Sequence, residues 1–82
     1  MIRVVEERDH YLLIADGDRF AVVERRAGKL YPLRDGARDG VALDDPRLPS
    51  LIARHEWCDE VEARRVLNEL LNRQDRLANT IW

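Results

Sequence analysis

The side chains best suited to chemistry in this chain of 82 residues are two histidines and one cysteine. His55 and Cys58 are three residues apart, with Glu56 and Asp59 beside them, so a zinc site completed by His10 can be drawn. Structural zinc usually takes four Cys or His ligands, often as two close pairs. The two histidines and single cysteine are too few for such a set, and we therefore expect no metal and no other cofactor.

Cys58 must also be considered as a nucleophile. A catalytic thiol needs a neighbouring base, a third group that orients the base, and a pocket. Cys58 stands just before a predicted helix, where the pKa of a thiol tends to fall, but the carboxylates of Glu56, Asp59 and Glu60 oppose that fall. We interpret Cys58 as buried and inert, and predict that the protein is not an enzyme. A small zinc- or thiol-dependent enzyme is the third hypothesis, and it requires bound zinc or rapid modification of Cys58 at neutral pH.

Other sequence patterns with known chemistry are missing. The chain has no Gly-rich phosphate loop and no paired-Cys motif, and its single serine, Ser50, follows a proline at the start of a predicted helix. Residues 35–45 hold two Asp-Gly turns, but a calcium loop needs alternating oxygen ligands and a terminal Glu. We interpret this segment as an acidic loop that could meet a basic patch of a partner protein, through Asp35, Asp39, Asp44 and Asp45.

Composition and length predict one globular domain over residues 1–82. Apolar residues make up 45% of the chain and charged residues 37%, a mixture that supports one modest core and a solvated surface. The longest apolar run, 11–15, is far short of the roughly 20 residues that a membrane span needs. A lone cysteine excludes an internal disulfide, and the N-terminus carries no apolar signal segment, so we expect a cytoplasmic protein.

The apolar residues change period once along the chain, and this change predicts an α+β fold. Short runs with alternation predict an antiparallel meander of three or four strands over residues 1–34, with strands at 2–8, 10–15, 19–25 and 29–34. Asp16-Gly17-Asp18 predicts one hairpin turn, and Arg26-Ala27-Gly28 predicts a three-residue loop with Gly28 left-handed. Pro32 lacks a donor N–H, so the last strand should lie at the edge.

Both faces of the predicted meander are apolar. Pairing across the Asp16-Gly17 turn joins residues of opposite parity. One face then carries Tyr11, Leu13, Ala15, Phe20 and Val22, and the other carries His10, Leu12, Ile14, Ala21 and Val23. One long helix can cover one face only, so a shorter helix or a second copy of the chain must cover the other.

Residues 46–82 form the predicted helical part. A short helix begins either with Asp45 as N-cap and Pro46 at the first position, or near Ser50, and its apolar stripe holds Leu48, Leu51, Ile52 and His55. A long helix is predicted over 60–81. Asp59 precedes it as the capping residue and forms an acidic variant of the capping box with Glu62. Pairs four residues apart, Glu60 with Arg64 and Glu69 with Arg73, support it. Its apolar stripe consists of Ala63, Leu67, Leu70, Leu77 and Ile81, interrupted by Gln74 and widened by Val61, Val66, Leu71 and Ala78.

The long helix is expected to extend beyond the sheet. A helix over 60–81 measures about 33 Å, whereas seven-residue strands reach about 23 Å. The surplus would leave apolar side chains in water, which monomers tend to avoid. We therefore predict a partner or dimer interface at Leu70, Gln74, Leu77, Ile81 and Trp82. The alternative is a helix that frays after Ala78, with Trp82 folded back on its own domain.

These features lead to two hypotheses of binding function. The first is a small protein-binding module, a homodimer that acts as an adaptor or inhibitor. Small proteins of mobile elements often work by occupying a partner's surface, so this module could be an anti-defence inhibitor. The second is a nucleic-acid-associated regulator, but neither the strand part nor the helical part of the chain has the excess of basic residues that such a function needs. Its contacts would come from Arg8, Arg19, Arg25, Arg26, Lys29, Arg64, Arg65, Arg73 and Arg76.

Overall fold

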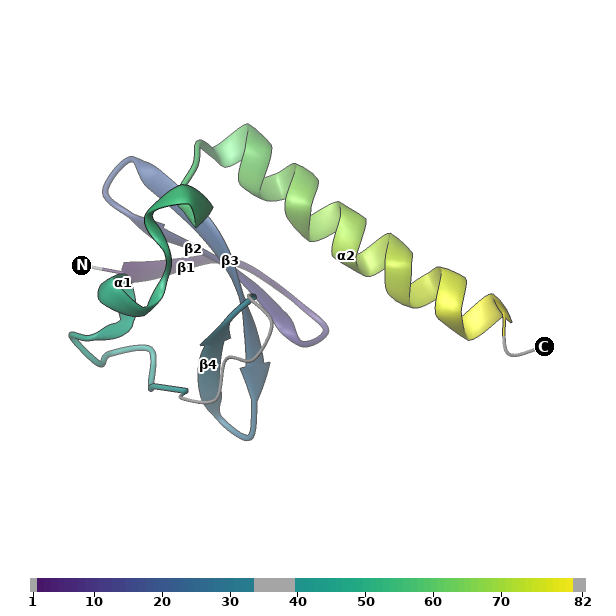
Figure 1. The fold of residues 1–82 in the computed structure, drawn as a ribbon, viewed down its shortest axis with the longest axis horizontal. Helices are drawn as coiled ribbons and strands as arrows, with labels where there is room; N and C mark the ends of the chain where they lie inside the picture. The colour runs from purple at the N-terminus through teal and green to yellow at the C-terminus, as the bar shows by residue number, and fades with distance from the viewer. Residues whose placement is uncertain (1, 34–39, 81–82) are drawn as a thin grey trace.

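The protein folds as an antiparallel meander followed by two short helical segments and one long helix (Figure 1). The computed structural model describes residues 2–33 and 40–80, and in the last helix it describes side chains as far as Arg73. This confirms the predicted α+β class, with four strands rather than three. The elements are β1 (Ile2–Arg8), β2 (Tyr11–Asp16), β3 (Arg19–Arg26), β4 (Lys29–Pro32), α1 (Leu48–Leu51), the 3₁₀ segment η1 (Arg54–Glu56) and α2 (Glu60–Thr80).

Each strand pairs with the next one along the chain, through loops of two residues. Arg8 pairs with Tyr11, Asp16 with Arg19, and Arg26 with Lys29. The loop predicted to have three residues therefore has two. Ala27 (φ 51°) and Gly28 (φ 78°) are both left-handed, as a type I′ turn requires. Gly28 was correctly placed, but Ala27 holds a conformation that costs energy for any residue with a Cβ.

The register across the β2–β3 turn puts the two apolar sets on opposite faces, as predicted. Leu13 pairs with Val22 and Ile14 with Ala21, so side chains of opposite parity share a face. On one face, Leu13 and Val22 are buried with Ala63 and Leu67 of α2. On the other face, the buried cluster combines strand residues with the segment around α1, and consists of Leu12, Ile14, Ala21, Val23, Leu30, Val41, Leu48 and Ile52.

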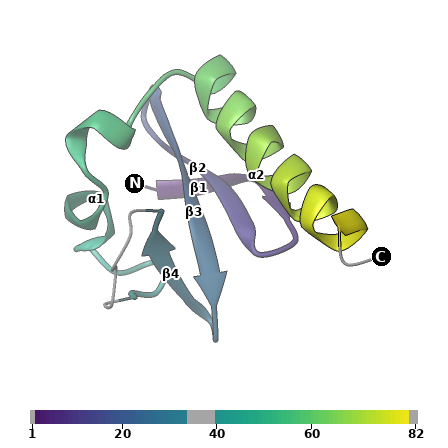
Figure 2. The same ribbon diagram turned by 45° about the vertical axis from the view of Figure 1, so that its right-hand side comes forward.

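The molecule therefore has three layers, with the sheet between α2 and the α1 segment (Figure 2). Leu48 and Ile52, which the sequence assigned to a short helix, close the face that α2 leaves open. Either a short helix or a second copy of the chain was expected to cover that face, and the structure shows the short helix there.

The α1 segment differs in detail from the prediction. The helix begins at Leu48, two residues after the predicted first position, with Arg47 as N-cap. Asp45 instead stabilises the turn before it, because its Oδ1 accepts the Arg47 N–H at 2.8 Å. His55 does not continue the stripe of Leu48, since it belongs to η1 and is exposed.

β4 lies at the edge of the sheet, as Pro32 indicated, and a crossing segment covers its outer side. The backbones of Leu30 and Val41 exchange hydrogen bonds of 2.8 and 3.1 Å. Next to Val41, a Cβ added to Gly40 would lie 2.5 Å from the Tyr31 ring. Gly40, predicted as part of a turn, is thus required by the close approach of an aromatic ring.

β4 pairs only with the second half of β3, which leaves the first half of β3 open for another partner. The backbone of Cys58 fills this position. Phe20 N–H donates to the Cys58 carbonyl at 2.7 Å, and Cys58 N–H donates to the Phe20 carbonyl at 2.8 Å. This pair fixes the chain where it passes from the α1 layer to the α2 layer.

α2 begins as predicted. Asp59 caps it through its Oδ1, which accepts the Glu62 N–H at 2.8 Å, and Glu60 pairs with Arg64. Glu62 and Glu69, however, both pair with Arg65. Val61 is 80% exposed, so its assignment to the apolar stripe was wrong.

α2 continues past its contact with the sheet. Among its described side chains, the last to pack against the core are Leu70 and Leu71. The helix then runs for nine more residues, 72–80, which we call the α2 tail; at 1.5 Å per residue it measures about 14 Å. Figure 1 shows this end of α2 beyond the strands.

Candidate functional site

A groove lies where β4 ends and Cys58 takes its place beside β3. Its apolar lining comes from β3, from the residue after β4 and from α2, and consists of Val22, Leu33, Ala63 and Val66. The polar and sulfur-bearing side chains come from η1, the segment after it and the first turn of α2: His55, Glu56, Cys58 and Glu62. We call this set of eight residues the Cys58 groove, and its volume is about 350 Å³.

Cys58 is held at the groove by backbone and side chain together. Its Sγ lies 3.5 Å from the Phe20 carbonyl oxygen, in addition to the two backbone bonds with that residue. Burial raises the pKa of the thiol, and the charges of Glu62 and Asp59 raise it further. A helix N-terminus normally favours the thiolate, but here burial and the carboxylates have the larger effect, as the neighbouring acids suggested.

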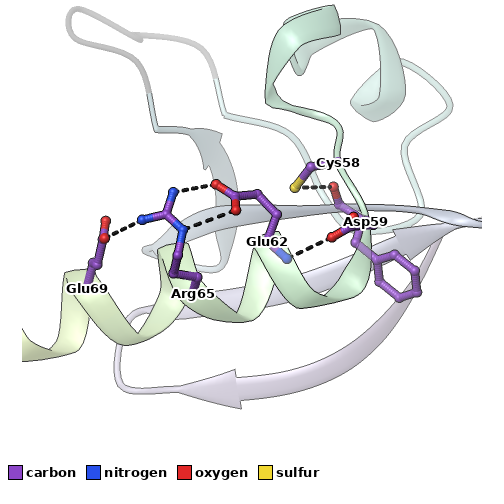
Figure 3. A network of polar contacts seen from close by, with 6 residues as sticks. Cys58, Asp59, Glu62, Arg65 and Glu69 are labelled. Carbon is purple, nitrogen blue, oxygen red and sulfur yellow. Dashed lines mark hydrogen bonds and ion pairs between the residues drawn. The ribbon is translucent and has the colours of Figure 1, made fainter.

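On the acidic side of the groove, Glu62, Arg65 and Glu69 are linked by ion pairs along α2 (Figure 3). Arg65 donates from Nε to Glu62 Oε2 at 3.1 Å and also pairs with Glu69. The hydrogen bond from Arg65 lowers the pKa of Glu62 below its usual value. One guanidinium thus serves two carboxylates, and this group of three keeps a net negative charge.

The residues weighed for zinc binding or catalysis do not converge. His55 and Cys58 both line the groove, while His10 lies in the β1–β2 loop and its carbonyl accepts the Arg25 N–H at 2.6 Å. Within residues 2–33 and 40–73, no three His, Cys, Asp or Glu side chains are grouped so that they could hold a metal ion. Across the described part of the chain, no helix is long and apolar enough to cross a membrane.

The acidic loop is described only at its end. Asp35 and Asp39 lie outside the described residues. Asp44 and Asp45 line a second hollow of about 390 Å³, together with Ile2, Leu43, Pro46 and Pro49. Hydrogen bonds from Arg47 lower the pKa of Asp45, so part of the negative charge predicted for a partner's basic patch is already paired.

The residues predicted for the interface lie along α2 and beyond it. Leu70 is half-buried against the core. Gln74 and Leu77 belong to the α2 tail, which is described by its backbone alone from residue 74 onward, and Ile81 and Trp82 lie outside the described residues. The sequence signalled the tail through helix length, but it gave no signal for the Cys58 groove, which depends on where β4 stops.

Most of the arginines proposed for nucleic-acid contacts lie within 4 Å of a carboxylate. The pairs are Arg8–Glu6, Arg19–Asp16, Arg25–Glu7, Arg26–Glu24, Arg64–Glu60 and Arg65–Glu62. Two of these guanidinium groups also stack on aromatic rings, Arg19 on Trp57 at 4.2 Å and Arg26 on Tyr31 at 4.1 Å. Each of these positive charges is therefore partly offset by a neighbouring carboxylate.

No protein-family model matches this chain, and neither a curated protein nor a solved structure matches it. The assignment of function therefore depends on geometry and chemistry.

Proposed function

We propose that this protein is a non-enzymatic binding module that uses the α2 tail to associate with a second copy of itself, and that the assembly acts as an adaptor or inhibitor. One observation carries the proposal. α2 is helical as far as Thr80, whereas its described contacts with the core end at Leu71. The tail extends a helix that is already formed, so it needs no new nucleation, but most helix stability in proteins comes from packing.

The spacing of residues along the tail indicates the kind of contact. Leu70, Gln74, Leu77 and Ile81 alternate four and three residues apart, which is the repeat of a helix that pairs with another helix. Gln74 is a polar residue within this seam, and a single such position can fix register and the number of partners at some cost in stability. A second copy offers the same seam, so the contact is self-complementary.

The alternatives have less support. The carboxylate partners of the arginines reduce the charge available for phosphate, so protein binding is favoured over nucleic-acid binding. The pKa of Cys58 is raised, and Cys58 and His10 contact opposite ends of β3, at Phe20 and Arg25, so a binding role is favoured over catalysis. We place the module in the cytoplasm, for which the single cysteine is the support.

The test is sedimentation of the full chain at several concentrations. The tail is short compared with a standard interface, so we expect a dimer with Kd in roughly the micromolar range. Leu77→Glu should shift the protein to monomer, because a carboxylate would be buried in the seam. Asn72→Glu is the matched control, since it adds the same charge to exposed Asn72 on the same helix.

Circular dichroism and the denaturation midpoint of both variants show whether the fold is kept. A wild-type chain that stays monomeric up to about 1 mM, or a Leu77→Glu variant that dimerises as the wild type does, would refute the proposal.

A further inference from the structure

The Cys58 groove has the size and lining of a site for a side chain from another molecule. An enclosed cavity of about 150 Å³ is enough to hold a benzene ring. At about 350 Å³, the groove has room for one large apolar side chain and the backbone next to it. Its floor is formed by Val22, Ala63 and Val66, which belong to the two main elements of the core.

The charge around this apolar floor is negative. Among the described residues that line the groove, Glu56 and Glu62 are acidic and none is Lys or Arg. Arg65 lies beside the rim, but Glu62 and Glu69 share it. The pKa of Cys58 is raised in part by Glu62 and Asp59, which agrees with a negative field inside the groove.

We propose that the Cys58 groove binds a short segment of a partner protein that carries a large apolar side chain next to an arginine or lysine. The apolar side chain enters between Val22 and Val66, and the neighbouring cation lies at Glu56 and Glu62 on the rim. A basic segment is selected because the described lining offers the carboxylates of Glu56 and Glu62, so opposite charges meet. The site is separate from the α2 tail and does not depend on dimerisation.

The test uses capped pentapeptides and the full-length chain labelled with ¹⁵N. The probe is acetyl-Gly-Arg-Leu-Arg-Gly-amide, and the comparison peptides replace both arginines by glutamine or the leucine by glycine. We expect the probe to bind at least about tenfold more tightly than either comparison peptide in low salt. Amide shifts should concentrate at Val22, Ala63 and Val66, and bound probe should slow the alkylation of Cys58, the only cysteine.

Variants then separate the groove from the rest of α2. Glu56→Gln with Glu62→Gln removes the rim charge with little change of shape, and should weaken the probe by about tenfold. Glu60→Gln is the matched control, because Glu60 is on the same helix, pairs with Arg64 and does not line the groove. Val66→Glu should abolish binding by placing a charge on the floor.

Three results would overturn the proposal. One is equal binding of the glutamine peptide, and another is a set of shifts that maps outside the groove. The third is binding of argininamide alone as tightly as the peptide, which would identify a site for small cations. Leu77→Glu, which tests dimerisation, should leave peptide affinity unchanged, so failure of one proposal is distinguishable from failure of the other.

Discussion

Truncation of Leu48 tests whether the α1 segment is a true layer of the core. Leu48 is fully buried on the face of the sheet opposite α2. Leu48→Ala removes three carbon groups, which at about 0.8 kcal/mol each gives about 2.4 kcal/mol. The cavity left behind raises the expected loss to about 3 kcal/mol. A domain of this size has a total stability of roughly 4–12 kcal/mol, so the loss should be easily measured.

The assay is urea denaturation followed by circular dichroism, with two reference variants. Leu67→Ala should cost a similar amount, because Leu67 is equally buried under α2 on the other face. Leu43→Ala makes the same chemical change at a leucine that is 40% exposed, and should cost about 1 kcal/mol or less. If Leu48→Ala behaved like Leu43→Ala, the α1 segment would not be the cover of that face, and the three-layer description would be wrong.

Three further changes address a cap, a thiol and a turn. Asp59→Ala should lower the free energy of unfolding by about 1 kcal/mol in urea denaturation, because the Glu62 N–H loses its acceptor; Asp59→Asn should restore most of the loss. The rate at which iodoacetamide alkylates Cys58 should still be rising above pH 9.0, because the pKa of the thiol lies above that ordinary value. Glu62→Gln should move this pH–rate profile to lower pH, since the charge of Glu62 helps to raise the pKa. A wild-type profile with its midpoint below pH 8 would contradict this description of the thiol's surroundings. Ala27→Asn should raise the free energy of unfolding by about 0.5–1 kcal/mol, and with it the denaturation midpoint, because Asn tolerates a left-handed φ better than Ala; an unchanged or lower midpoint would count against a type I′ turn here.

The parts of the fold that the sequence predicted well are those set by local signals. The apolar runs of β2 and β3 and the glycine at position 17 were enough to predict both the register and the two faces. Asp59 identified the start of α2 because an N-cap acts within one turn. Pro32 identified an edge strand for a similarly local reason, the missing N–H.

The parts that were missed depend on contacts between distant residues. The Cys58 groove exists because β4 stops early and Cys58 pairs with Phe20, 38 positions away. No local pattern around Cys58 records that contact. Val61 was assigned to the apolar stripe because helical spacing allowed it, but the first turn of α2 turns this side chain away from the sheet. Arg65 was equally unpredictable as the hub of two ion pairs, since Glu69 had Arg73 as an equally spaced alternative.

The two borders of the sheet differ from those of proteins that grow by strand addition. On one side, Val41 already occupies backbone groups of Leu30 in β4. On the other, β1 carries an irregularity between Val4 and Glu6, and a kinked, charged strand is a poor template for another chain. The folded protein therefore has little opportunity to stack edge to edge into fibrils, and concentrated solutions of it should remain free of cross-β assemblies.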